Sequence, residues 1–340
     1  MREIRAVILA AGKGTRMKSD LSKMVHDVMG KPMVEYVADA CRSVGIETIY
    51  VIVGSGAEQV KHALGSDYCY VLQQPQLGTG HALMQVRPLL EDYKGDLLVL
   101  VGDSPFITPD VLNKLITKHR ASDACATFIT AIFEQPPPYG RIVRDNNGKV
   151  LKITEEKDAT PQVKAIKEVN AAHYCFKAEI VLPLLSEISN DNVKQEYYLT
   201  DIIEILTNNN HSVETLQEVD ARLVFGINNR LDMAEAFKIF RQQILSNFMQ
   251  AGVTIVDPAT IFIDNTVTIG SDTIIYPFTY IQQNTVIGKN CRIGPFVYIT
   301  NSEIKENSEL SFTVIRNPET SGQQPHSDPA LRDKDEEHEG

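Results

Sequence analysis

The sequence predicts a doubly wound, Rossmann-like α/β domain with a mostly parallel sheet, followed by a short left-handed parallel β-helix. Two observations predict this fold class. Short apolar runs alternate with amphipathic stretches over about the first 230 residues, the order typical of a parallel sheet with helices on both faces. Further along, an isoleucine recurs at every sixth position from Ile263 to Ile299, a period that a helix or a hairpin does not produce and that hexapeptide β-helices have.

Strands of the first domain are expected at residues 4–10, 48–54, 70–74, 96–102 and 126–133. Several of these runs are apolar without alternation, which indicates strands buried on both faces. Helices are expected at residues 33–44, 57–64, 81–90 and 109–120. Because ligands of such sheets bind beyond the carboxyl ends of the strands, we expect a site at the loops after Ile8 and Leu100.

Four parts of the chain are predicted. Residues 1–230 form the α/β domain, 231–250 a linker helix and 251–317 the β-helix, in which the isoleucines stack inside a triangular coil of roughly three turns. The register slips at Ile304 and the repeat fades after Ile315. Residues 318–340 are rich in Gly, Pro, Ser and Gln with an acidic end, so they are predicted to be a disordered tail and are assigned no function.

Composition excludes several classes of protein. No apolar run is long enough to cross a bilayer and the N-terminus does not resemble a secretory signal, so a cytoplasmic location with no membrane partner is expected. The five cysteines are scattered, which supports neither a disulfide framework nor a zinc site. A net charge of -11 argues against nucleic acid as a partner.

The first candidate site is the glycine-rich segment LAAGKGTRM at residues 9–17, which follows a buried strand. Gly12 and Gly14 allow backbone N–H groups to approach anionic oxygens. Arg16 and Lys23 add two cations nearby. The spacing matches neither a Walker loop nor the dinucleotide fingerprint. The segment indicates a phosphate-binding turn; the alternative is a tight turn with surface cations.

The second candidate is the turn at Gly78, Thr79 and Gly80, which precedes helical sequence. It can contact an anion or a base, and Gln73 at the end of the preceding strand can hydrogen-bond a nucleobase edge. The alternative is an ordinary loop. His81 is interpreted as a residue at the start of a helix rather than a catalytic base.

The third candidate is Asp103, directly after a buried strand, where proteins often hold a hard divalent cation. Mg²⁺ there would bridge Asp103 and triphosphate oxygens and neutralise charge. The alternative is an aspartate that caps the next turn. Later polar residues, Glu155, Asn170 and Asn228, have the carboxylate and amide groups that bind adjacent sugar hydroxyls.

In their order and spacing these motifs resemble bacterial N-acetylglucosamine-1-phosphate uridyltransferases, the N-terminal half of a bifunctional enzyme that also acetylates glucosamine-1-phosphate. The strings that carry the resemblance are LAAGKGTRM, QLGTGHA, GDSP, YGRIVR, EEKDA, EYYLTDI and GINNR. They extend from Leu9 to Arg230, and the hexapeptide region continues the likeness to about Ile315.

The resemblance implies that UTP and N-acetyl-α-D-glucosamine-1-phosphate react to UDP-N-acetylglucosamine and pyrophosphate, with Mg²⁺ as cofactor and a homotrimer as the assembly. Arg16, Lys23 and Asp103 would act in catalysis, with the two cations facing phosphates, and Asp103 and Asn228 would hold the metal. The remaining residues implied on the nucleotide side are Leu9, Ala10, Ala11, Gly12, Gly14, Val101 and Gly102, with Gln73, Gly78 and Thr79 at the uracil. Those implied on the sugar side are Gly140, Glu155, Asn170, Tyr198 and Thr200.

The chain departs from the family pattern at a few positions. Val101 stands in place of Tyr and Ser22 in place of Pro. Ala171 and Ala172 replace the Thr-Gly that usually follows the sugar-binding Asn170, which leaves the identity of the sugar open. The family's acetyl-transfer site needs a longer β-helix than the roughly three coils present, so acetyl transfer is expected to be absent.

An anionic phosphate oxygen of the sugar phosphate would attack the α-phosphorus in line, so no general base is needed and positioning and charge neutralisation supply the catalysis. Two alternatives remain open. One is the same chemistry with another pair, such as TTP or GTP with glucose- or mannose-1-phosphate. The other is a non-catalytic scaffold; retention of Arg16, Lys23, Asp103 and Asn228 together favours an enzyme.

Overall fold

The computed structural model describes residues 2–218, 220, 222 and 225–317, and the predicted tail 318–340 lies outside them. The chain divides into two compact units, Met1–Ile239 and Phe240–Gly340. The division falls inside the long helix α8 (Arg230–Gln250), at the position where the linker helix is predicted.

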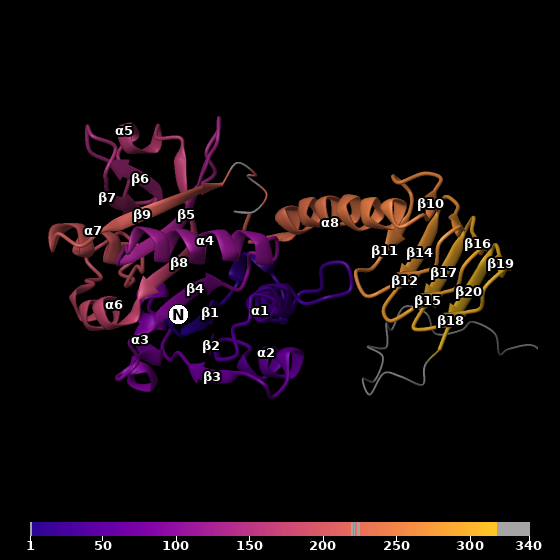
Figure 1. Ribbon diagram of the computed structural model, residues 1–340, viewed down its shortest axis with the longest axis horizontal. Coiled ribbons are helices and arrows are strands. Elements are labelled where there is room, and N and C mark those ends of the chain that lie inside the picture. The colour runs from indigo at the N-terminus through magenta and orange to yellow at the C-terminus, as the bar shows by residue number, and fades with distance from the viewer. Residues whose placement is uncertain (1, 219, 221, 223–224, 318–340) are drawn as a thin grey trace, which may run out of the picture. The chain divides into compact units, whose positions relative to one another are not determined.

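Unit 1 is built on a nine-stranded sheet whose main path runs β3-β2-β1-β4-β8-β5-β9 (Figure 1). Parallel pairs join β1 to β2 and β4, β2 to β3, and β5 to β9. Only β8 on this path is antiparallel to its neighbours β4 and β5. The strands of the path are β1 (Ile4–Ala10), β2 (Ile49–Val53), β3 (Cys69–Leu72), β4 (Asp96–Val101), β5 (Ala126–Ile132), β8 (Glu168–Lys177) and β9 (Val213–Glu218). The predicted, mostly parallel sheet is confirmed.

Strands β1 and β4 are central because their apolar side chains are buried on both faces. Alternate residues of a strand point to opposite faces, and in β1 Val7 and Leu9 enter one hydrophobic cluster while Ile8 enters the other. These unalternating runs therefore fold as the buried parallel strands they predict.

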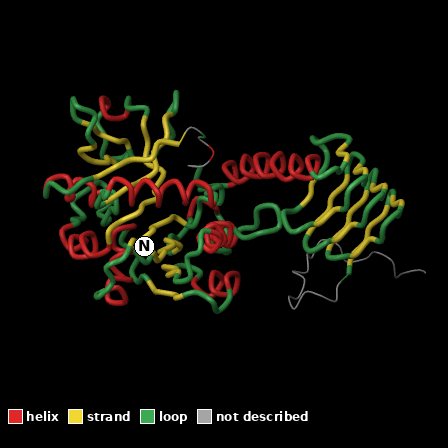
Figure 2. Tube along the Cα trace, in the orientation of Figure 1, coloured by secondary structure: helices red, strands yellow, loops and turns green. Residues whose placement is uncertain are grey.

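Two sets of helices cover the two faces of the sheet (Figure 2). Helices α3 (Thr79–Val86), α6 (Ala178–Leu184) and α7 (Asp201–Asn208) contribute side chains to one cluster. Helices α1 (Met33–Ser43), α2 (Ala57–Leu64) and α4 (Pro109–Ser122) contribute to the other. The observed helix differs from the predicted helix 81–90, because α3 starts earlier and ends before a 3₁₀ turn at Arg87–Leu90. Pro88 in this turn has no N–H to donate to the next helical hydrogen bond.

The antiparallel pair β6 (Arg141–Arg144) and β7 (Val150–Thr154) branches from the main path, because β6 also pairs with β8. The short helix α5 (Pro161–Lys164) follows β7. Among the strands of unit 1, β6, β7, β8 and β9 are not among those predicted from the sequence.

Unit 2 is a three-faced parallel β-helix. Its sheets have the orders β10-β13-β16-β19, β11-β14-β17-β20 and β12-β15-β18. The strands are β10 (Thr254–Ile255), β11 (Phe262–Ile263), β12 (Thr268–Ile269), β13 (Ile274–Ile275), β14 (Thr279–Gln282), β15 (Val286–Ile287), β16 (Arg292–Ile293), β17 (Val297–Thr300), β18 (Glu303–Ile304), β19 (Glu309–Leu310) and β20 (Thr313–Arg316).

The isoleucines of the repeat stack inside this β-helix as predicted. Ile281 pairs with Ile263 on one side and Ile299 on the other, and all three are fully buried. The predicted slip in register is also present, since Ile287 pairs with Ile304 rather than with a residue eighteen positions on.

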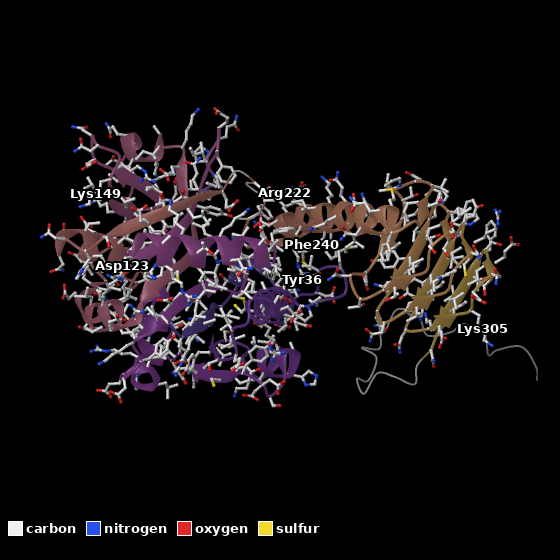
Figure 3. All side chains as sticks on the ribbon, viewed as in Figure 1. Tyr36, Asp123, Lys149, Arg222, Phe240 and Lys305 are labelled. Carbon is white, nitrogen blue, oxygen red and sulfur yellow. The ribbon has the colours of Figure 1, made fainter. Side chains whose placement is uncertain are left out.

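Many charged side chains lie at the surface. Exposed side chains such as Asp123, Lys149 and Lys305 lie on the outside of their units (Figure 3). Across the described part of the chain, no helix has both the length and the apolar character needed to span a bilayer.

Candidate functional site

The candidate site begins where β1 and β4 end side by side. Leu9 pairs with Val101, and the Gly102 N–H donates to the Leu9 carbonyl at 3.0 Å. The loop that starts at Ala10 and the loop that carries Asp103 therefore leave the same edge of the sheet. This is the carboxyl edge at which the sequence predicts a site.

Gly14 allows the glycine-rich loop to turn back against Lys23. Its φ of +59° lies in the left-handed region, and a Cβ there would stand 2.6 Å from the Lys23 Cβ. Any side chain at this position would push Lys23 away. Gly12, in contrast, has no atom within 4 Å of the position of a Cβ, so its exposed backbone is open to a ligand.

Four predicted side chains from three separate parts of the sequence meet at this edge. The Lys23 Nζ forms an ion pair with Asp103 Oδ2 and donates to Asn228 Oδ1 at 2.8 Å. The Arg16 Nη2 donates to the same Asn228 oxygen at 2.8 Å. Lys23 is only 7% exposed, so its charge is directed at these partners rather than into solvent.

A backbone hydrogen bond joins the two loops of this cluster, and a side chain of α8 fixes Asn228. The Ile227 N–H donates to the Asp103 carbonyl at 3.0 Å, and the Asn228 N–H donates to Asp232 Oδ2 at 2.8 Å. Asn228 Nδ2 donates to the Gly226 carbonyl at 3.0 Å, which leaves Oδ1 facing the cations. The predicted pair Asp103 and Asn228 is therefore placed at one point.

This donor set fits a hard cation that is completed by phosphate oxygens. Asp103 and Asn228 supply oxygen atoms, which Mg²⁺ prefers, and Mg²⁺ is usually held by one or two carboxylates together with substrate phosphates. Within the described residues no group of three or more His, Cys, Asp or Glu side chains is arranged to hold a metal by itself.

The side chain of Gln73 supports the turn at Gly78. Gln73 is 3% exposed, and its Nε2 donates to the Gly78 carbonyl at 2.9 Å and contacts His81 Nδ1 at 3.0 Å. Gln73 is predicted to bind a nucleobase edge, and in the structure its amide nitrogen instead holds the loop. A Cβ on Gly78 would lie 2.5 Å from the Tyr197 carbonyl, so this loop packs backbone to backbone.

The residues predicted for the sugar side form a second cluster. The Asn170 N–H donates to the Gly140 carbonyl at 2.9 Å. A Cβ on Gly140 would lie 3.6 Å from Glu155 Oε1, which itself accepts from Thr200 Oγ1 at 3.0 Å. Burial raises the pKa of Glu155, and burial together with Glu155 raises the pKa of Asp201 to about 6.

Segment 197–200 connects the two sides. The Gly80 N–H donates to the Tyr197 carbonyl at 2.8 Å, and the Leu199 N–H donates to Thr79 Oγ1 at 3.0 Å. Tyr198, predicted on the sugar side, is 7% exposed in the same segment. The turn at Gly78 and the Glu155 cluster are therefore neighbours through one piece of chain.

Two residues of this region are not among those predicted from the sequence. Tyr139 accepts the Gly226 N–H at 3.1 Å and so ties the Gly140 loop to the loop of Asn228. Tyr174 accepts a hydrogen bond from Asn170 Nδ2 at 2.7 Å. Tyr139 directly precedes Gly140 in the YGRIVR string, which is the signal that could have found it; Tyr174 has none.

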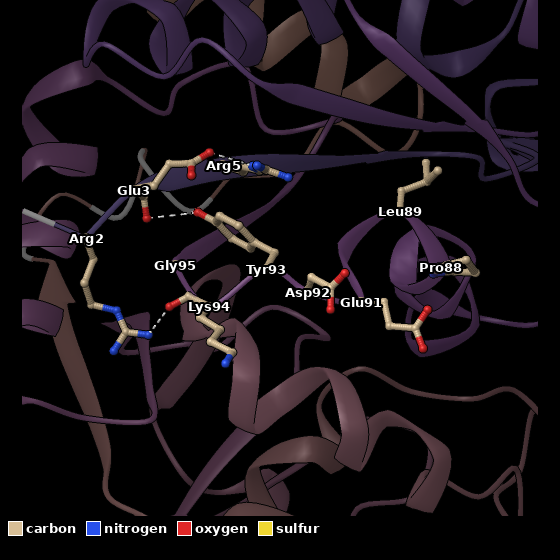
Figure 4. Close-up of a pocket in the computed structure, with 10 residues that line it drawn as sticks. All are labelled: Arg2, Glu3, Arg5, Pro88, Leu89, Glu91, Asp92, Tyr93, Lys94 and Gly95. Atoms are coloured by element: carbon tan, nitrogen blue, oxygen red, sulfur yellow. Dashed lines mark hydrogen bonds and ion pairs between the residues drawn. The ribbon is translucent and has the colours of Figure 1, made fainter.

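A cavity of about 520 Å³ lies elsewhere in unit 1 (Figure 4). It is lined by Arg2, Glu3, Tyr93 and Gly95, which precede β1 and β4. It therefore opens at the amino ends of the strands, the edge opposite the predicted site residues.

Comparison with known proteins agrees with this geometry. The sequence profile of the nucleotidyl transferase family matches residues 5–221, which contain the sheet and most of the site. The chain belongs to the nucleotidyl transferase family. The bacterial transferase hexapeptide profile (six repeats) matches residues 266–301 within the β-helix, as expected for a left-handed hexapeptide β-helix.

Several relatives of this nucleotidyl transferase are bifunctional GlmU proteins. That of Geobacillus sp. (strain WCH70) is 48% identical over 82% of this chain and 61% of its own length. That of Acetivibrio thermocellus is 44% identical over 93% of this chain and 68% of its own length. The GlmU protein of Bacillus subtilis (strain 168) is 43% identical over 91% of this chain and 68% of its own length. The chain thus spans about three fifths to two thirds of the length of these relatives.

A solved structure supports the fold alone. A putative glucose-1-phosphate thymidylyltransferase from Bacillus anthracis is similar with a TM-score of 0.58 at 18% identity, covering 69% of this chain and 94% of that one.

Proposed function

We propose that this nucleotidyl transferase forms UDP-N-acetylglucosamine and pyrophosphate from UTP and N-acetyl-α-D-glucosamine-1-phosphate. The observation that carries the proposal is the cluster of Arg16, Lys23, Asp103 and Asn228 beside the open backbone of Gly12. The motif strings from Leu9 to Arg230 and the similarity to GlmU proteins support UTP and the N-acetylated sugar as the substrates.

In this reaction a phosphate oxygen of the sugar phosphate attacks the α-phosphorus of UTP. The bond from the α-phosphorus to the bridging oxygen breaks, and the electron pair leaves with pyrophosphate. The nucleophile is anionic at neutral pH, so no side chain has to remove a proton. Lys23 and Arg16 stabilise charge on the phosphates, and the exposed N–H groups of the glycine-rich loop position them.

Mg²⁺ is part of the proposal, with Asp103 and Asn228 as its protein ligands; when bound, it neutralises charge on the triphosphate and pyrophosphate. In the structure the Lys23 ammonium contacts the oxygens of both residues. Lys23 therefore has to turn from these oxygens toward phosphate when the substrates bind.

On the sugar side, Asn170 and Glu155 bind hydroxyl or acetamide groups, and Gly140 keeps the space between them free of a side chain. Glucose- or mannose-1-phosphate with another nucleotide remains the alternative, because Ala171 and Ala172 lie next to Asn170. The absence of acetyl transfer stays a prediction.

The mechanism predicts that Lys23→Ala or Asp103→Ala lowers pyrophosphate release by about 10²–10³-fold. The measurement is a pyrophosphate-release assay with Mg²⁺ over a panel of nucleotides and sugar phosphates. Lys177→Ala is a matched control, since Lys177 forms an ion pair with Asp123 at 2.6 Å at the opposite edge of the sheet. We expect this control to retain the wild-type rate.

A near-wild-type rate in either site variant would contradict the mechanism. Activity with a different pair would correct the substrates and keep the chemistry. A wild type that is inactive with every pair would favour the scaffold alternative.

We also propose that the β-helix assembles three copies of the chain. Phe278, Phe296 and Phe312 stack along one corner of the β-helix with ring centroids 5.0 and 5.4 Å apart, and each ring is more than half exposed. A continuous exposed aromatic stripe favours contact with a second surface.

The trimer is tested by replacing all three phenylalanines with Asn, which tolerates the positive φ that each of them has. We expect light scattering to give three chain masses for the wild type and a lower mass for the variant. A wild type that is monomeric at micromolar concentration would disprove the trimer.

A further inference from the structure

Strand β8 contains an irregular step beside the sugar side of the site. Against β5, Tyr174 pairs with Phe128 and Asn170 pairs with Thr130, so the three residues between these pairs on β8 oppose a single residue on β5. The intervening segment bulges, and Ala172 within it has a φ of +57°. A residue with a Cβ rarely adopts this conformation, and such strain persists only where the surroundings hold it.

The bulge is held by the side chain of Asn170. Its Oδ1 accepts the Ala172 N–H at 3.0 Å, and its Nδ2 donates to Tyr174 Oη at 2.7 Å. A backbone N–H can only donate, so the oxygen of the amide has to face Ala172 and the nitrogen has to face Tyr174. The two contacts together define which way the amide of Asn170 points.

Tyr174 is a rigid partner for this amide. The side chain is 2% exposed and its ring stacks on Phe176 with centroids 5.3 Å apart. The backbone N–H of Asn170 is also bound, to the Gly140 carbonyl. One N–H and one oxygen lone pair of the Asn170 amide therefore remain for a ligand, in directions that the protein sets in advance.

We propose that Tyr174 is a positioning residue for the sugar phosphate, acting through Asn170. This inference rests on the proposed function, because it takes Asn170 as a sugar contact. Without the Tyr174 hydroxyl, one N–H of the Asn170 side-chain amide has no partner and the amide can rotate. Binding of the sugar then has to restrict this rotation, which weakens binding. The Tyr174 hydroxyl itself bonds to Asn170 on the sugar side, so binding of the nucleotide should be unaffected by its loss.

The test is Tyr174→Phe, which removes the hydroxyl and keeps the ring. Its matched control is Tyr93→Phe, because Tyr93 is another buried tyrosine whose hydroxyl contacts the Glu3 and Asp96 carbonyls at the opposite edge of the sheet. A purely structural role would make the two variants alike: each would melt at a lower temperature, with unchanged kinetic constants.

We expect Tyr174→Phe to raise the KM for N-acetylglucosamine-1-phosphate about tenfold, the loss of roughly one hydrogen bond. The KM for UTP should stay within about twofold of the wild-type value. The ratio of activity with N-acetylglucosamine-1-phosphate to activity with glucose-1-phosphate should become smaller as well. Tyr93→Phe should leave all three quantities unchanged, and thermal melting shows that both variants are folded.

An unchanged sugar KM and an unchanged preference in folded Tyr174→Phe would overturn the positioning role while the proposed function stands. An equal rise of both KM values would also overturn it, since the effect would then not be specific to the sugar. A wild type that is inactive with both sugar phosphates would overturn the proposed function, and this inference with it.

Discussion

His119 lies on α4 with only 1% of its surface exposed. Its Nδ1 is 3.0 Å from Thr127 Oγ1, and its Nε2 is 3.9 Å from the buried carboxylate of Asp96. Burial lowers the pKa of His119 to about 4; Asp96 opposes this shift, and Lys177, Arg2 and Arg120 add to it. The folded protein therefore keeps the ring neutral where an unfolded chain, with a pKa of 6.5, takes up a proton.

This difference predicts acid sensitivity of a definite sign. The contribution of His119 to stability is complete above pH 6.5 and is lost as the pH falls toward 4, because only the unfolded chain binds the proton in that window. His119→Gln stays neutral. Over this window its free energy of unfolding should therefore fall by about 2 kcal/mol less than that of the wild type. Urea unfolding at pH 7 and pH 5 measures it, and equal losses in both proteins would contradict the prediction.

Individual residues also show what a sequence can reveal about this site. Gly14 and Asp103 each follow a strand in a recognisable string, and Lys23 comes six positions after the first of these strings, so all three can be predicted. Asn228 lies 205 positions from Lys23, and its contact with that residue appears only in the fold. Tyr174 acts through Asn170 from inside the core, and no local pattern distinguishes it from other core aromatics.

Among the elements, β8 is the most instructive omission. Its sequence places Asn170 and His173 among apolar residues and contains the bulge at Ala172, so it has neither a continuous apolar run nor a regular alternation. Its antiparallel insertion between β4 and β5 depends on pairing over a long sequence distance. The parallel strands β1 and β4 and the repeat of the β-helix carry their signal locally and are predicted.

The strand β15 of the β-helix allows a sharp test of the inward and outward alternation. Ile287 is 1% exposed and its neighbour Val286 is 46% exposed. Ile287→Ala should destabilise unit 2 by about 2–5 kcal/mol, because it leaves a cavity between stacked coils. Val286→Ala should change stability by less than about 0.5 kcal/mol. Urea unfolding measures both, and similar losses would show that the side chains are not segregated as described.

At the scale of the molecule, the site depends on the whole of unit 1. The glycine-rich loop follows the first strand, Asp103 follows the fourth, and Asn228 comes after the last strand of the sheet. These loops can be predicted from their motifs. That they meet follows from the strand order β1-β4-β8-β5, which cannot be read from the sequence.

Arg16 and Asn228 contact each other across 212 positions of the chain. A molecule that binds at this cluster recognises only the completely folded unit, so by mass action it draws the folding equilibrium toward that state. At a ligand concentration of 100 times its Kd the gain is about 2.7 kcal/mol. Under the proposed function this ligand is UTP, so an abundant supply of UTP would also protect the protein from unfolding, and a shortage of UTP would leave it more open to proteolysis.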